Sequence, residues 1–92
     1  MKPKREKVQV IYDILKAIKE KEGRIKPTHI MYKANLSPQM LKTYLEELII
    51  KGLVLEKRLG KGKTYFLTEK GLKYIQEYQV ILGFVDSFGL NE

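Results

Sequence analysis

The sequence predicts a mainly α-helical domain that carries one small β-hairpin. Apolar residues recur at three- and four-residue spacings in segments 4–22 and 69–86, as they do on one face of a helix. A tight turn centred on Asn35-Leu36 separates two further helical segments. The stretch 53–67 places residues that favour strands on both sides of a glycine-punctuated turn.

Composition and charge narrow the class of protein. The chain has 92 residues, enough for one domain, and no cysteine, which excludes disulfides, thiolate catalysis and Cys-ligated zinc. Its net charge is +7. Residues 1–35 hold ten basic and four acidic residues, 36–70 hold seven and four, and 71–92 hold one and three. The basic surface therefore belongs to the first three quarters, and it favours nucleic acid as a partner.

Three expectations concern the cellular compartment and the source of the protein. No apolar run approaches the ~20 residues that span a bilayer, and the basic N-terminus precedes an amphipathic segment, so we predict neither a membrane span nor a signal peptide. The absence of cysteine fits a reducing compartment, so we expect a cytoplasmic protein associated with the nucleoid. Many Lys and Glu beside few Asn and Gln favour a thermophilic source.

Helix boundaries follow from local sequence. The first helix, 4–22, carries an apolar stripe and ends at Gly23, which can take a left-handed conformation. Pro27 suits the first position of a short helix over 27–34. Ser37 is a candidate N-cap for a third helix that ends at Lys51-Gly52. The expected core residues of these helices are Val8, Ile11, Tyr12, Leu15, Ile18, Ile30, Ala34, Leu36, Leu41, Tyr44, Leu45 and Leu48.

The second half of the chain completes the fold. Strands are expected over 53–58 and 64–67, and Thr68 can cap a last helix over 69–86. A helix-turn-helix followed by a β-hairpin wing is the winged helix-turn-helix arrangement. We therefore expect a DNA-binding domain over 1–68 and a C-terminal dimerisation helix over 69–92.

The third helix supplies candidate base-reading residues. If Leu41, Leu45 and Leu48 face inward, the outward residues are Gln39, Lys42, Thr43 and Glu46. Gln can bond adenine, Lys can reach guanine, and the Thr methyl can touch the thymine methyl. An ordinary solvated helix face is the alternative.

The hairpin tip supplies candidate phosphate contacts. Lys57, Arg58, Lys61 and Lys63 surround two glycines, and each can neutralise a backbone phosphate. A solvated basic turn is the alternative. A nucleotide-binding phosphate loop does not fit, because the motif needs a glycine where Lys57 stands and a helix where a strand follows.

No catalytic or metal constellation stands out. His29 is the only histidine, and we expect it to contact a phosphate or to lie on the plain surface. The chain is therefore expected to be no enzyme, and to need neither a metal nor another cofactor.

The last helix is a candidate dimer interface. The apolar residues Ile75, Tyr78, Leu82 and Val85 alternate three- and four-residue steps as in a heptad seam. Further apolar surface is expected from Ile81, Phe84, Phe88 and Leu90. Packing on its own domain is one alternative. Membrane attachment is another, but the helix lacks the basic face that such anchors use.

Four segments carry a family resemblance: 11–15, 30–37, the pair Tyr44-Leu45, and 67–71. Together they resemble a family of small, basic archaeal winged-helix proteins that bind DNA and are predicted transcriptional regulators. The resemblance implies no enzyme activity and dimerisation through the last helix as an antiparallel coiled coil. By position it implies a DNA-facing side and a wing formed by Tyr32, Lys33, Ser37, Gln39, Lys42, Thr43, Arg58, Lys61 and Lys63.

The sequence therefore predicts a homodimeric protein that binds double-stranded DNA, as a transcriptional regulator or as an architectural protein. Two alternatives stay open. One is a protein–protein interaction module that keeps the fold without DNA, and the other is the docking subunit of a nucleic-acid-processing complex.

Overall fold

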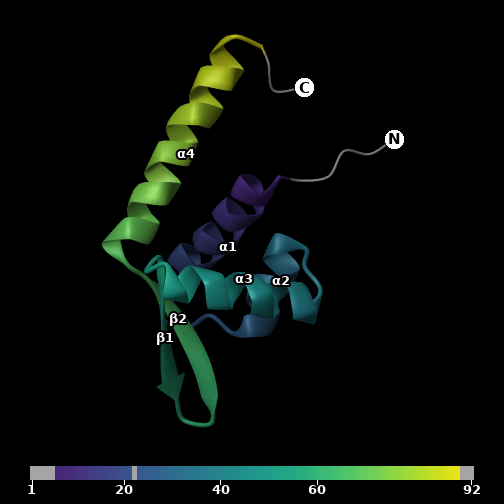
Figure 1. Cartoon of the computed structure of the whole chain (residues 1–92), viewed down its shortest axis with the longest axis vertical. Coiled ribbons are helices and arrows are strands. Elements are labelled where there is room, and N and C mark those ends of the chain that lie inside the picture. The colour runs from purple at the N-terminus through teal and green to yellow at the C-terminus, as the bar shows by residue number, and fades with distance from the viewer. Residues whose placement is uncertain (1–5, 22, 90–92) are drawn as a thin grey trace.

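The computed structural model describes residues 6–21 and 23–89, and Figure 1 shows their arrangement. The elements follow in the order α1 (Lys7–Lys21), α2 (Pro27–Ala34), α3 (Pro38–Ile50), β1 (Val54–Leu59), β2 (Gly62–Leu67) and α4 (Glu69–Ser87). The predicted class, four helices with one antiparallel hairpin, is confirmed.

Most boundaries lie within one residue of the predictions, and the larger differences are at the first helix and at the hairpin tip. Residues 4, 5 and 22 of the first expected helix lie outside the described residues, and α1 itself begins at Lys7. The hairpin strands extend further toward the tip than expected, so that only Gly60 and Lys61 remain as the turn. Gly60 has a φ of 63°, which the first position of a type II′ turn requires and which an L side chain disfavours.

The turn between α2 and α3 forms as predicted. Asn35 has a left-handed φ of 55°, and its position lets the chain reverse within three residues. Ser37 then caps α3, since its Oγ accepts a hydrogen bond of 3.2 Å from the Met40 N–H. The left-handed conformation of Asn35 and the Ser37 cap therefore stabilise the turn between the two helices.

The core lies around α1, which is covered by α2, α4 and the hairpin. Ile14, Leu15 and Ile18 of α1 are fully buried, as is Ile30 of α2. Val8 was predicted in the same stripe but is 49% exposed. It lies in the first turn of α1, where it lines an open hollow between α1, α3 and α4.

The first turn of α4 is tied to the end of α3. The Thr68 hydroxyl accepts a hydrogen bond from the Gly71 N–H (3.1 Å) and donates one to the Gly52 carbonyl (2.6 Å). Gly71 packs so closely that a Cβ there would overlap the Leu53 carbonyl oxygen. Ile75, one turn further, is only 1% exposed. The start of α4 is therefore part of the core.

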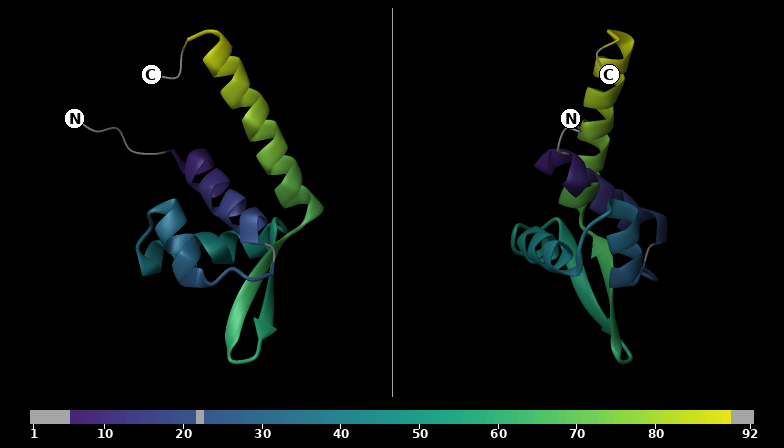
Figure 2. Two further views of the ribbon diagram at one scale, coloured as in Figure 1. Left: turned by 180° about the vertical axis from the view of Figure 1, so that it is seen from behind. Right: turned by 90° about the vertical axis from the view of Figure 1, so that its right-hand side faces the viewer.

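The far end of α4 projects beyond the rest of the chain (Figure 2). Before it does so, Gln79 Nε2 donates a hydrogen bond of 3.3 Å to the Tyr12 hydroxyl of α1. Tyr12 and Tyr78 form the last aromatic contact with α1, with ring centroids 4.6 Å apart. The radius of gyration is 13.9 Å, against about 12 Å for a compact chain of this length. The excess arises because α4 and the hairpin project from opposite ends, at the top and bottom of Figure 1.

Candidate nucleic-acid interface

The outward face of α3 is as predicted. Gln39, Lys42, Thr43 and Glu46 are all exposed. The Thr43 hydroxyl donates a hydrogen bond of 3.1 Å to the Gln39 carbonyl, so its methyl group remains for an outside contact. Ser37 is exposed, but its hydroxyl is engaged as the cap of α3. This face therefore offers an amide, an ammonium group, a methyl group and a carboxylate.

The register of the hairpin divides its basic residues between two faces. Arg58 pairs with Lys63, and Glu56 pairs with Tyr65, so these four side chains share one face. Lys57 pairs with Thr64 on the opposite face, where its Nζ lies 5.2 Å from the centre of the Phe66 ring. Lys61 occupies the turn itself.

A groove of about 390 Å³ joins α3 to the first of these faces. Its rim includes Lys42 and Glu46 of α3 and Glu56 and Lys63 of the hairpin. Apolar and aromatic side chains line the rest, contributed by Pro27, Met31, Pro38, Leu41, Leu45, Ile49 and Tyr65. Lys42 and Glu46 of α3 therefore border the same groove as Glu56 and Lys63 of the hairpin, whereas Gln39, Thr43 and Arg58 do not line it.

Glu56 controls the charge of that surface. Its Oε2 lies 3.6 Å from the Lys63 Nζ and accepts a hydrogen bond of 3.2 Å from the Tyr65 hydroxyl. Burial, with the nearby Glu56 charge adding, raises the pKa of Tyr65 to about 12, so its hydroxyl stays protonated at neutral pH. In the described part of the chain, no ion pair engages Lys42, Arg58 or Lys61.

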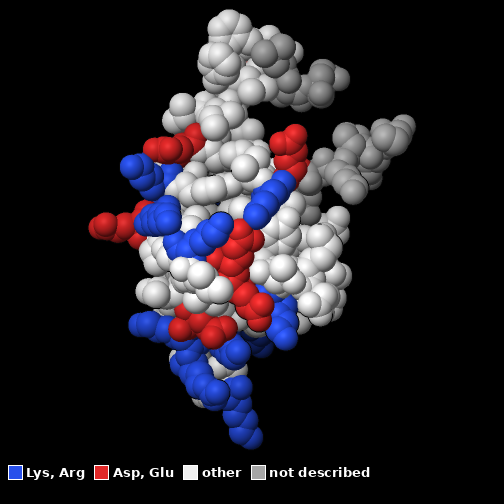
Figure 3. Space-filling view, in the orientation of Figure 1, with Lys and Arg blue, Asp and Glu red and all other residues white. Residues whose placement is uncertain are grey.

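Lysine and arginine gather over the hairpin at the bottom of Figure 3, whereas the far end of α4 at the top is mostly uncharged. The uneven charge along the sequence thus gives the folded molecule a basic end at the hairpin and a mostly uncharged end at α4. A polyanion is attracted to one end of the molecule and not to the other.

Tyr32 and Lys33 lie apart from the groove. Tyr32 is 77% exposed on α2, at the edge of a second hollow that α2 shares with α1. Lys33 faces α1, where its Nζ is 3.9 Å from Glu20 Oε1. The groove is lined instead by Pro27, Thr28 and Met31 of α2.

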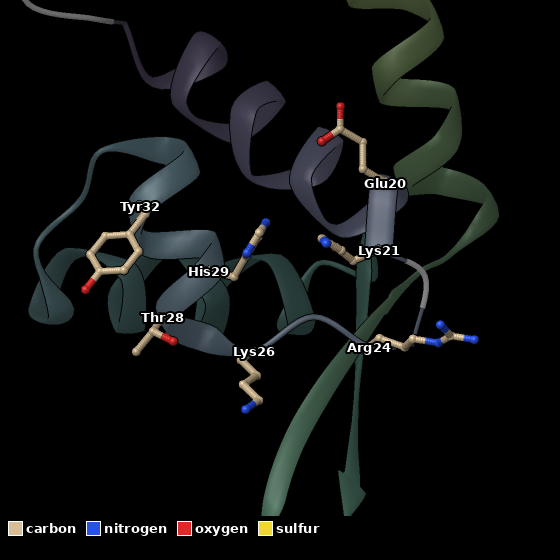
Figure 4. Close-up of a pocket in the computed structure, with 7 residues that line it drawn as sticks. All are labelled: Glu20, Lys21, Arg24, Lys26, Thr28, His29 and Tyr32. Carbon is tan, nitrogen blue, oxygen red and sulfur yellow. The ribbon is translucent and has the colours of Figure 1, made fainter.

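That second hollow was not predicted. It gathers Lys21, Arg24, Lys26, Thr28 and His29 near the start of α2 (Figure 4). The signal for it in the sequence is a group of three basic residues within six positions, which the net charge alone does not reveal. His29, expected at the surface or at a phosphate, is partly buried there.

Some of the predicted dimer residues are buried within the single chain, and others are exposed, while Leu90 lies outside the described residues. Ile75 lies in the core of the single chain, and Tyr78 is partly buried against it. Ile81 and Leu82 are exposed, and Val85 is half-buried. Val80, Phe84 and Phe88 add a further exposed apolar strip, so the uncovered surface is wider than the predicted seam.

Two searches of the described residues gave negative results. No group of three or more His, Cys, Asp or Glu residues in residues 6–21 and 23–89 could hold a metal ion. None of the helices in that same part of the chain is both long enough and apolar enough to cross a membrane.

The helix-turn-helix, the capped third helix and the basic hairpin define the winged helix-turn-helix class. The family model described as winged helix-turn-helix matches residues 4–83, and the chain belongs to this family.

The chain is also similar to one curated protein and to several solved structures. The uncharacterized protein MJ0290 of Methanocaldococcus jannaschii is 36% identical over 78 residues, which are 85% of this chain and 34% of that protein. The chain therefore spans about a third of the length of this curated relative.

The crystal structure of Sso10a-2, a DNA-binding protein from Sulfolobus solfataricus, superposes with a TM-score of 0.78 at 23% identity, covering 91% of this chain and 85% of that one. A winged-helix DNA-binding protein from STIV gives a TM-score of 0.71 at 25% identity over 86% and 91% of the two chains. The resemblance to archaeal winged-helix proteins is thereby confirmed.

Proposed function

We propose that the chain binds double-stranded DNA with the exposed face of α3 in the major groove and with the hairpin against the adjacent backbone. One observation carries the proposal: Lys42 and Glu46 on the outward face of α3 border the same groove as Lys63, which pairs with Arg58 on the hairpin. The similarity of the chain's fold to Sso10a-2 and the STIV protein, both of which are DNA-binding proteins, supports it.

Each part of the surface has a distinct role in this proposal. Gln39, Lys42 and Thr43 contact base edges, and Arg58, Lys61 and Lys63 contact phosphates. Glu46 borders the groove and can accept a hydrogen bond from the cytosine amino group. Tyr32 lies at the margin, and Lys33 and Lys57 contribute to the general positive field.

Pairing of two chains through α4 completes the proposal. Leu82 and Val85 follow Ile75 and Tyr78 by seven residues, so they continue the side of α4 that faces α1. A second α4 lying antiparallel along this side would cover them and leave both hairpins free. In this arrangement residues 1–68 bind DNA and residues 69–92 join the subunits.

The biological role we propose is transcriptional regulation. Selection from genomic and random DNA fragments, followed by sequencing of the bound pool, tests this role. A recurrent motif is expected for a regulator, and even coverage would instead indicate an architectural protein.

Binding itself is tested by fluorescence anisotropy with a labelled duplex across a range of salt concentrations. The double change Lys61→Ala and Lys63→Ala should weaken binding equally on all sequences and lower the salt slope by roughly 1–2. The matched control is Lys19→Ala with Lys73→Ala, which removes the same charge away from the hairpin. Equal affinity of the two double variants would remove the hairpin from the interface.

A further inference from the structure

A hollow of about 730 Å³ lies between the end of α1, the following turn and the start of α2 (Figure 4). Its lining combines three basic side chains with a hydroxyl group, an imidazole and a phenol ring. These belong to Lys21, Arg24, Lys26, Thr28, His29 and Tyr32. Among the described residues, Glu20 is the one acidic side chain in the lining, and it lies near Lys33.

The three basic side chains have no acidic partner within residues 6–21 and 23–89. Lys21, Arg24 and Lys26 are all exposed, so they raise the local potential without being neutralised. A concave surface lined by one sign of charge raises the local concentration of the opposite ion. The hollow therefore favours an anion.

The adjoining polar groups point to the same chemistry. Lys26 stands at the N-cap of α2 but makes no side-chain hydrogen bond to the first turn, unlike the caps of α3 and α4. The start of α2 adds a partial positive charge. The Nε2 atom of His29 is buried with no hydrogen-bond partner in the described part of the chain. Buried polar atoms usually have such a partner.

We propose that this hollow binds a phosphate group at a site separate from α3 and the hairpin. A phosphate carries more charge and more acceptor oxygens than a carboxylate, so it gains more from a hollow surrounded by positive charge. In Figure 4, Lys21 and His29 turn toward the space between α1 and α2, whereas Arg24 and Lys26 extend away from it on different sides. The site is therefore open, and a phosphate within a larger molecule can enter it.

Two sources of phosphate fit this geometry. Thr28 lines both this hollow and the groove between α3 and the hairpin, so the backbone of a duplex on α3 can continue into the hollow. This source rests on the proposed function. The other source is a free phosphate compound, which does not depend on DNA binding.

The first arm of the test uses inorganic pyrophosphate as the probe. His29 is the only histidine in the chain, so its imidazole gives a single set of NMR signals that reports on the hollow. Pyrophosphate should shift these signals. The triple change Lys21→Gln, Arg24→Gln and Lys26→Gln should weaken pyrophosphate binding roughly tenfold or more, since the three positive charges that surround the hollow are lost.

The matched control is Lys16→Gln with Lys19→Gln and Lys73→Gln. It removes the same charge from exposed positions outside the hollow, so it should bind pyrophosphate as the native chain does. Circular dichroism on all three proteins shows whether the fold is kept.

The second arm measures duplex binding by the same proteins and separates the two sources. A backbone phosphate predicts that the triple variant loses affinity and salt slope, by roughly 1–3, and that duplex displaces pyrophosphate. A free phosphate compound predicts unchanged duplex binding with pyrophosphate binding lost. A native chain that binds no duplex contradicts the proposed function, and the pyrophosphate arm alone then decides the site. The inference is overturned if the triple variant binds both probes as tightly as the control does.

Discussion

At the scale of residues, Glu56 sets how much positive charge the hairpin presents. Its carboxylate lies 3.6 Å from the Lys63 ammonium and accepts a hydrogen bond from the Tyr65 hydroxyl. It therefore contacts both an exposed lysine and a buried tyrosine of the core. Exposed ion pairs contribute little to stability, typically ~0–1 kcal/mol. The larger consequence of the Glu56–Lys63 pair is therefore for binding, because a paired lysine is less available to a phosphate.

Glu56→Gln should tighten binding to any duplex. The amide can still accept the hydrogen bond from Tyr65, while Lys63 is released and one negative charge leaves the groove. The salt slope should increase by roughly 1. Anisotropy measured beside Glu77→Gln, an exposed change of the same charge on α4, checks this. An identical gain in both variants would mean that net charge alone is responsible.

Gln39→Ala addresses base reading on α3. If the selected fragments share a motif, this change should cost ~1–3 kcal/mol on that motif and little on random DNA. Gln76→Ala, which removes the same amide from an exposed position of α4, should leave both affinities unchanged. An equal loss on motif and random DNA would restrict α3 to backbone contacts.

At the scale of elements, two glycines of α4 have opposite roles. Gly71 lies against the Leu53 carbonyl, whereas an added Cβ at Gly83 would meet no atom within 4 Å. Gly71→Ala should destabilise the fold by ~1–3 kcal/mol, because the junction of α4 with β1 must open. Gly83→Ala should stabilise α4 by up to ~1 kcal/mol. Denaturation by urea measures both changes, and a stabilising Gly71→Ala would contradict the tight junction.

The elements themselves were predictable because their signals are local. Pro27, Ser37 and Thr68 start helices within a residue of the observed positions, and Gly52 ends α3 with a φ of 80°. The face of the hairpin on which each lysine lies was not predictable. It depends on the register, and the register follows from a turn of two residues where the sequence predicted five.

The candidate site was predictable in part for the same reason. Helical spacing alone places Gln39, Lys42, Thr43 and Glu46 outward on α3. The pairing of Lys63 with Glu56 and the hollow at the start of α2 both require the packing of separate elements. Neither spacing nor composition contains that information.

At the scale of the whole molecule, charge and apolar surface lie at opposite ends. The hairpin end is basic, and the far end of α4 exposes Val80, Ile81, Leu82, Phe84 and Phe88. Two chains joined at the apolar end would present two basic ends to one duplex. Linking two binding units raises avidity without any new contact.

Leu82→Glu should therefore give a monomer that keeps its fold and binds DNA far more weakly. The added carboxylate would be buried without a partner in the paired state, which is costly. Gln76→Glu places the same charge on the polar side of α4 and should leave the mass and affinity unchanged. Light scattering beside circular dichroism decides the matter. A native chain that is already monomeric at tens of micromolar would contradict the pairing.

The projection of α4 beyond Gln79 has a consequence for amide hydrogen exchange. Helices shorter than ~12–15 residues are marginal in water unless their side chains are covered. In a single chain, the last turns of α4 lack such cover, whereas α1 is enclosed by its neighbours. Amides near Phe84 should then exchange with deuterium much faster than those near Leu15. If pairing supplies the missing cover, exchange near Phe84 slows as the protein is concentrated, while exchange near Leu15 stays the same.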